Sequence, residues 1–171
     1  MTPKKILVVH NPRTGFAQIR LGDYLKALET RGAFPVLRTL SDDFDFKEVL
    51  KDASDFERVV VAGGDGTVSG AASILQGTGV PLVAYPGGTA NLLALNLKMP
   101  ATADKLAEVT LKGPVIPTDL GRLDYRIYRR RDYLRARLGL NFSHDLLTAH
   151  FTVMAGSGLV AHLVKGAEPF K

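Results

Sequence analysis

The chain has 171 residues, 46% of them hydrophobic, and a formal net charge of +5. This length predicts one domain with at most part of a second, and the apolar share is enough for a buried core. The absence of cysteine excludes disulfides, thiolate metal sites and a cysteine nucleophile. The start, MTPKKILVV, is too short for a signal peptide and no apolar run approaches membrane-spanning length, so we expect a cytoplasmic protein.

Short apolar runs alternate with helical stripes along most of the chain. The runs predict strands over residues 4–9, 34–40, 59–61 and 81–85. The stripes predict helices over residues 21–28, 46–50, 68–75, 92–97 and 102–112. Gly32 is placed to end the first helix, and Asp43 or Asp45 to cap the second. This alternation predicts an α/β fold, a parallel sheet with helices on both faces.

The strand over residues 59–61 runs into the loop Gly63-Gly64-Asp65-Gly66-Thr67, directly before a helix. Unpaired N–H groups and the positive end of the helix dipole meet at such a junction, which favours a phosphate. Glycine would allow positive φ and a close approach of the backbone to the guest. For a lone Gly-Asp-Gly, the alternative is a tight turn with a solvated aspartate.

Two further strands end in loops of the same kind. Pro86-Gly87-Gly88-Thr89-Ala90-Asn91 follows residues 81–85, and His10-Asn11-Pro12-Arg13-Thr14-Gly15 follows the first strand. In an open α/β sheet, ligands bind where the carboxyl ends of the strands meet. We therefore expect these loops to form one ligand site.

The motifs HNPRTG, VAGGDGTV and PGGTANLLA together resemble the diacylglycerol kinase catalytic domain family, which includes sphingosine kinases and bacterial lipid kinases. GGDGT is shared with NAD kinases, and the PGGTAN loop favours the lipid kinase branch. The resemblance covers most of the chain, to AGSGLVAHLV near its end. It implies an ATP-dependent kinase that phosphorylates diacylglycerol or a similar lipid in phospholipid biosynthesis.

Phosphoryl transfer requires neutralised phosphates, a metal ion and a base near the acceptor hydroxyl. Asp65 is the sole carboxylate in the two glycine loops, so we predict that it is the catalytic residue and the Mg²⁺ ligand. The predicted ATP-binding residues are Asn11, Gly63, Gly64, Gly66, Thr67, Gly88, Thr89 and Asn91. Alternatively, Thr89 and Asn91 cap a helix, Asn11 stabilises its own turn, and Arg13 is a surface charge rather than a phosphate ligand.

The chain departs from the family just after GGDGT. Relatives usually carry an Asn-Glu pair there, and the glutamate helps to orient the site, whereas this chain has Ser69 and Gly70. In addition, Leu92 stands where many relatives carry aspartate. The four histidines are interpreted as structural or exposed.

The pattern changes after Pro114, and we predict a nucleotide domain over residues 1–116 and a partial β-rich domain over residues 117–171. Alternating residues 123–127 predict a half-buried strand, with residues 148–155 as an antiparallel partner. Two strands alone are marginal in water. We therefore expect an incomplete enzyme that binds ATP with little lipid phosphorylation and self-associates, as a homo-oligomer, through the apolar stripe of residues 159–164.

Seven arginines lie between residues 122 and 137. We predict that Arg129, Arg130 and Arg131 contact anionic lipid headgroups at a membrane surface. The alternative is a solvated hairpin whose arginines prevent edge pairing, and no nucleic acid partner is expected.

Two other functions stay open. An NAD kinase would phosphorylate NAD and no lipid. A non-catalytic nucleotide-binding or regulatory module would bind ATP without transferring phosphate.

Overall fold

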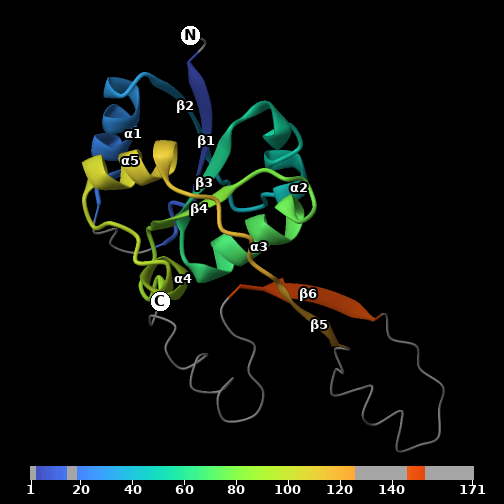
Figure 1. The fold of residues 1–171 in the computed structure, drawn as a ribbon. Helices are drawn as coiled ribbons and strands as arrows, with labels where there is room; N and C mark the ends of the chain where they lie inside the picture. Colours follow the sequence, from blue (N-terminus) through green and yellow to red (C-terminus); the bar gives the residue numbers. More distant parts are fainter. Residues whose placement is uncertain (1–2, 15–18, 126–145, 153–171) are drawn as a thin grey trace, which may run out of the picture.

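The computed structural model describes residues 3–14, 19–125 and 146–152. Its strands are β1 (Lys4–His10), β2 (Ala33–Thr39), β3 (Arg58–Gly63), β4 (Leu82–Pro86), β5 (Gly121–Tyr125) and β6 (Leu147–Phe151). Its helices are α1 (Leu21–Thr30), α2 (Phe46–Val49), α3 (Asp65–Leu75), α4 (Leu92–Asn96) and α5 (Ala103–Lys112), with a 3₁₀ turn at Ala53–Asp55. Figure 1 shows how these elements are arranged.

The first four strands form one parallel sheet in the order β2-β1-β3-β4. Helices α1 and α5 cover one face, and α2 and α3 cover the other (Figure 1). The predicted parallel sheet with helices on both faces is confirmed. Since parallel strands run in one direction, the loops that follow β1, β3 and β4 all leave the same edge of the sheet.

Strand β1 shows why its apolar run is continuous. Ile6 and Val8 pack under α1 and α5 with Tyr24 and Leu106, and all four side chains are completely buried. Leu7 and Val9 point to the other face, into the cluster that contains residues of α2 and α3. A strand covered on both faces needs apolar residues at successive positions rather than alternate ones.

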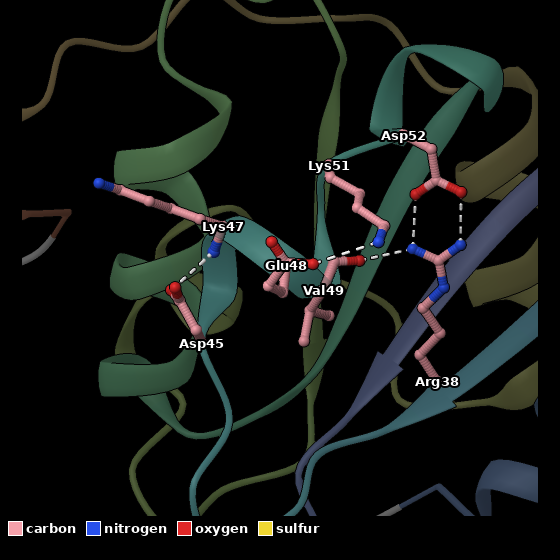
Figure 2. Close-up of polar contacts among 7 residues, drawn as sticks. All are labelled: Arg38, Asp45, Lys47, Glu48, Val49, Lys51 and Asp52. Atoms are coloured by element: carbon pink, nitrogen blue, oxygen red, sulfur yellow. Dashed lines mark hydrogen bonds and ion pairs between the residues drawn. The ribbon is translucent and has the colours of Figure 1, made fainter.

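Local signals set the ends of α1 and α2. Gly32 follows α1 with φ of 79° and donates its N–H to Glu29 O at 2.9 Å. Asp45 caps α2, since its carboxylate accepts the Lys47 N–H at 2.9 Å (Figure 2). Both predicted helix ends are confirmed.

Arg38 holds edge strand β2 to the segment that follows α2. Its guanidinium donates to both oxygens of Asp52 at 2.6 and 2.7 Å and to Val49 O at 2.5 Å (Figure 2). It also lies 5.6 Å from the centre of the Phe56 ring. The hydrogen bond from Arg38 lowers the pKa of Asp52 below its ordinary value.

Strands β5 and β6 form a separate antiparallel pair, with Arg122 opposite His150. This predicted pairing is confirmed, and β6 lies against α3 (Figure 1). The proposed boundary at residue 116 stays a prediction. Residues 129–131 and 159–164, to which we assigned membrane contact and self-association, lie outside the described residues. Among the residues that are described, no helix is long and apolar enough to cross a membrane.

Candidate functional site

The two glycine loops touch through their backbones. A Cβ built on Gly88 would lie 2.5 Å from the Cα of Gly64, and one on Gly87 would lie 3.0 Å from the N of Gly63. Gly63 has the same constraint toward its own helix, because its Cβ would lie 2.7 Å from the Cβ of Thr67. Gly87 and Gly88 thus let the ends of β3 and β4 approach each other, and Gly63 makes room for Thr67.

The expectation that these glycines adopt positive φ is wrong. Gly64 has φ of −77°, and the described glycines with positive φ are Gly32, Gly77 and Gly79. Within the loops, the left-handed residue is Asn91, with φ of 50°. The glycines therefore serve close packing, and an asparagine, which tolerates this region well, makes the turn.

Asn91 closes its own loop. Its Oδ1 accepts the Gly88 N–H at 2.6 Å and its Nδ2 donates to Gly88 O at 2.7 Å. Although Asn91 holds the N-cap position of α4, its side chain makes no capping bond, so the alternative that it caps this helix is wrong. The N–H of Gly88 is consequently engaged within the loop.

Asp65 supplies the cap that Asn91 does not. Its two carboxylate oxygens accept the N–H groups of Leu92 and Leu93, each at 3.1 Å. The side chain is half-buried and bridges loops that lie more than 25 residues apart in the sequence. Asp65 is therefore a structural link between the GGDGT and PGGTAN loops, whatever else it does.

The first turn of α3 is open. Gly64 is at its N-cap and no side chain caps the helix, whose first backbone bond runs from Val68 N–H to Gly64 O at 3.1 Å. The N–H groups of Asp65, Gly66 and Thr67 have no hydrogen-bond partner among the described residues. Gly66 is also exposed to solvent. This turn can bind an anion through its free donors and the helix dipole.

Asn11 links the loop after β1 to α3. Its Oδ1 accepts the Arg13 N–H at 3.0 Å, and its Nδ2 donates to Thr67 Oγ1 at 2.9 Å. The alternative that Asn11 stabilises its own turn is thus confirmed, and the same side chain also reaches the second loop. Arg13 forms a surface ion pair with Asp42, as the alternative for that residue predicts.

Most predicted site residues lie together at this edge of the sheet. Thr67 is 9% exposed and belongs to the first turn of α3, whereas Thr89 is exposed on the PGGTAN loop. Thr89 makes no side-chain hydrogen bond within the described part of the chain. Gly63 is buried at the end of β3.

The residues at which the chain departs from the family serve packing. A Cβ on Gly70 would lie 2.4 Å from the Phe46 ring, so the glycine makes room for α2. Ser69 bonds Thr152 Oγ1 at 2.8 Å, and Ser73 bonds His150 Nδ1 at 2.9 Å, which together hold β6 on α3. No prediction from the sequence included this contact between α3 and β6, although serines at positions i and i+4 of a helix do share one face.

The described histidines fit a structural interpretation. His150 bonds Ser73, and partial burial lowers the pKa of His10, which favours its neutral form. Across residues 3–14, 19–125 and 146–152, no group of three or more histidines and carboxylates could hold a metal ion.

Comparison with known proteins identifies relatives. The family model for the diacylglycerol kinase catalytic domain matches residues 5–123. The chain is 32% identical over 124 residues to a diacylglycerol kinase of Mycobacterium tuberculosis, covering 70% of this chain and 40% of that protein. It is 26% identical over 135 residues to a diacylglycerol kinase of Staphylococcus carnosus, covering 73% and 43%.

A solved structure has the same fold. The crystal structure of a diacylglycerol kinase from Bacillus anthracis aligns with a TM-score of 0.52 at 24% identity, over 72% of this chain and 43% of that chain. The chain thus spans between 40% and 43% of the length of these relatives.

Proposed function

The chain belongs to the diacylglycerol kinase catalytic domain family, and on that premise we propose that it is the nucleotide-binding part of an ATP-dependent lipid kinase. The enzyme transfers the γ-phosphate of ATP to a hydroxyl of diacylglycerol or a similar lipid. The observation that carries the proposal is the open first turn of α3, flanked by the loops that follow β1 and β4.

In this proposal the phosphates of ATP lie at the start of α3. The N–H groups of Gly66 and Thr67 donate to phosphate oxygens, assisted by the helix dipole. Gly64 has room for a Cβ, whose nearest neighbours would be Thr14 Cγ2 at 3.6 Å and Gly88 Cα at 3.9 Å. This free space supports a close approach of the phosphate to the Gly64 backbone.

The other predicted residues have supporting roles. Gly88 lets the two loops touch, Gly63 makes room for Thr67, and Asn91 holds the PGGTAN loop in its turn. The exposed hydroxyl of Thr89 is available to the nucleotide.

Mg²⁺ fits this site as an ion carried by the nucleotide. Magnesium sites of this kind use one or two carboxylates together with substrate phosphates. Each oxygen of Asp65 accepts one N–H and keeps a further lone pair. The carboxylate therefore still has the capacity to coordinate the ion, directly or through water. When bound, Mg²⁺ neutralises charge that develops on the phosphates. Asp65 is accordingly our proposed metal-binding and catalytic residue.

The reaction is located at the cytoplasmic surface of a membrane, where a lipid hydroxyl and ATP can meet, and it contributes to phospholipid biosynthesis. Support comes from the two relatives from Mycobacterium tuberculosis and Staphylococcus carnosus, which are both named diacylglycerol kinases.

The test measures binding and transfer separately. ATP binding to the 171-residue chain is measured by isothermal titration calorimetry, and we expect saturable binding. Transfer is measured with γ-labelled ATP, Mg²⁺ and vesicles containing diacylglycerol, sphingosine or monoacylglycerol, with NAD in a separate reaction. We expect label only in lipid, and at a low rate, because the chain spans less than half the length of the diacylglycerol kinases that it matches. Label in NAD alone would establish an NAD kinase, and a folded chain that does not bind ATP would refute the proposal.

A further inference from the structure

Both ends of the Asn11 side-chain amide are engaged. Oδ1 accepts the backbone N–H of Arg13, and Nδ2 donates to Thr67 Oγ1. The Arg13 N–H determines which end of the amide is the oxygen, because an N–H can only donate. The amide nitrogen, which also can only donate, therefore faces the hydroxyl of Thr67.

This orientation decides what the Thr67 hydroxyl can do. A hydroxyl has one proton to donate and two lone pairs that accept. Since Asn11 donates to the oxygen, Thr67 keeps its own proton for a different acceptor. By comparison, the hydroxyls of Thr30 and Thr110 each donate their proton to the backbone carbonyl four residues earlier, at 2.8 Å. Thr67 has no such acceptor among the described residues, although it is only 9% exposed.

The surroundings of Thr67 favour an anionic acceptor. The hydroxyl belongs to the same helical turn as the unpartnered N–H groups of Asp65 and Gly66. Thr14, the other hydroxyl nearby, already donates to Asn11 O at 2.8 Å. A buried donor without an acceptor is costly, and a bound phosphate oxygen removes that cost.

We propose that Asn11 is a positioning residue, which orients the Thr67 hydroxyl as a hydrogen-bond donor to a phosphate oxygen of the nucleotide. Asn11 then acts through Thr67 rather than by touching the nucleotide. The inference rests on the proposed function, because it takes the phosphate of ATP as the acceptor.

Calorimetric titration with ATP, and separately with inorganic pyrophosphate, tests this role. Thr67→Val removes the hydroxyl proton at nearly constant side-chain volume. It should lower the affinity for ATP and for pyrophosphate about tenfold, which is the effect of one hydrogen bond to a charged group. Thr67→Ser keeps the hydroxyl and should stay within about threefold of wild type. Asn11→Asp places an acceptor opposite Thr67, which consumes the hydroxyl proton, and should also weaken binding about tenfold.

A double variant separates this effect from simple charge repulsion. If Asn11 acts through Thr67, the double variant Asn11→Asp, Thr67→Val should lose much less ligand affinity than the product of the fold-losses of the two single variants. Thr110→Val is the matched control, since it removes another buried helical hydroxyl, on the far face of the sheet. It should lower the unfolding temperature and leave both affinities unchanged.

Each outcome decides one question. Unchanged ATP binding by a folded Thr67→Val chain overturns the inference and leaves the proposed function standing. A double variant whose loss of affinity equals the product of the two single losses also overturns the positioning role. Pyrophosphate binding that depends on Thr67, without ATP binding, would show that Thr67 donates to a phosphate that is not part of ATP, which contradicts the proposed function and overturns the nucleotide as the acceptor. A folded wild-type chain that binds neither ligand refutes both.

Discussion

Gly88 illustrates, at the scale of a residue, how the absence of a side chain shapes the candidate site. Its hydrogens face the backbone of Gly64, so the position leaves no volume for a methyl group. The neighbour is main chain at the end of a sheet strand, which cannot rotate away as a flexible side chain could. Relief of such a clash requires the two loops to separate.

Gly88→Ala should therefore lower the free energy of unfolding by about 1–3 kcal/mol and weaken ATP binding, because overpacking displaces the PGGTAN loop. Urea unfolding and calorimetric titration check both effects. Gly22→Ala is the control, since Gly22 lies at an exposed position of α1 where a Cβ meets nothing within 4 Å. This substitution should stabilise the chain by about 0.5–1 kcal/mol. A Gly88→Ala chain as stable as wild type would show that the loops are not packed as described.

Asp52 offers a second residue-scale prediction, on pH. Arg38 lowers the pKa of Asp52 in the folded chain, so the pair stabilises the fold above the ordinary carboxyl pKa and loses that contribution as pH falls through the folded value. Asp52→Asn should cost about 1 kcal/mol or less at pH 7, since both side chains are partly exposed. The difference from wild type should shrink below about pH 4. A difference in unfolding free energy that stays constant from pH 7 to pH 2 would contradict this role.

At the scale of elements, α3 joins the rest of the molecule. Its first turn is bonded by Asn11 from the loop after β1, and its Asp65 caps α4. Its Gly70 leaves room for the Phe46 ring of α2, and Ser69 and Ser73 form hydrogen bonds that hold β6 against the helix. A displacement at the start of this helix therefore reaches both sheets.

Asp65→Ala should uncap α4, which at five residues is too short to be stable by itself. We expect a loss of about 1 kcal/mol in stability and faster amide exchange at Leu92 and Leu93, observed by NMR without nucleotide. ATP affinity should fall even with EDTA present, because the loop pair is disturbed whether or not a metal is bound. A loss confined to Mg²⁺-containing buffer would mean that Asp65 acts only through the ion.

Asp45→Ala is the matched control for Asp65→Ala. Asp45 caps α2, so its variant should also lose stability. It should leave exchange at Leu92 and Leu93 unchanged. Equal changes at these two amides in both variants would mean that general loosening, rather than the cap, is being measured.

On the scale of the whole molecule, a segment rich in arginine links β5 and β6 in the sequence. The substitution of Arg129, Arg130 and Arg131 by glutamine should weaken sedimentation with anionic vesicles, most clearly at low salt. Substitution of Lys26, Lys105 and Lys112 by glutamine removes the same charge from exposed positions on α1 and α5 and should have a smaller effect. Equal effects of the two triple substitutions would mean that net charge alone drives the association. A wild-type chain that does not sediment with anionic vesicles would favour the alternative of a solvated hairpin.

Much of the fold and the meeting of the three loops that form the candidate site could be predicted from the sequence, because both follow from local patterns. The periods of the apolar residues indicated the strands and helices, and the glycine loops after three strands indicated one edge of the sheet. The capping role of Asp45 and the helix end at Gly32 were also local, since each involves atoms a few residues apart.

What only the tertiary structure decided depends on which backbones meet. Asp65 was predicted from composition as a catalytic carboxylate, yet its contact with Leu92 and Leu93 arises because β3 and β4 pair in a register that brings their loops together. The same pairing explains why Gly87 and Gly88 are needed for contact rather than for positive φ. Such contacts join segments far apart in the sequence, so no local period or motif encodes them, and they exist only once the crossover helices have placed the strands side by side.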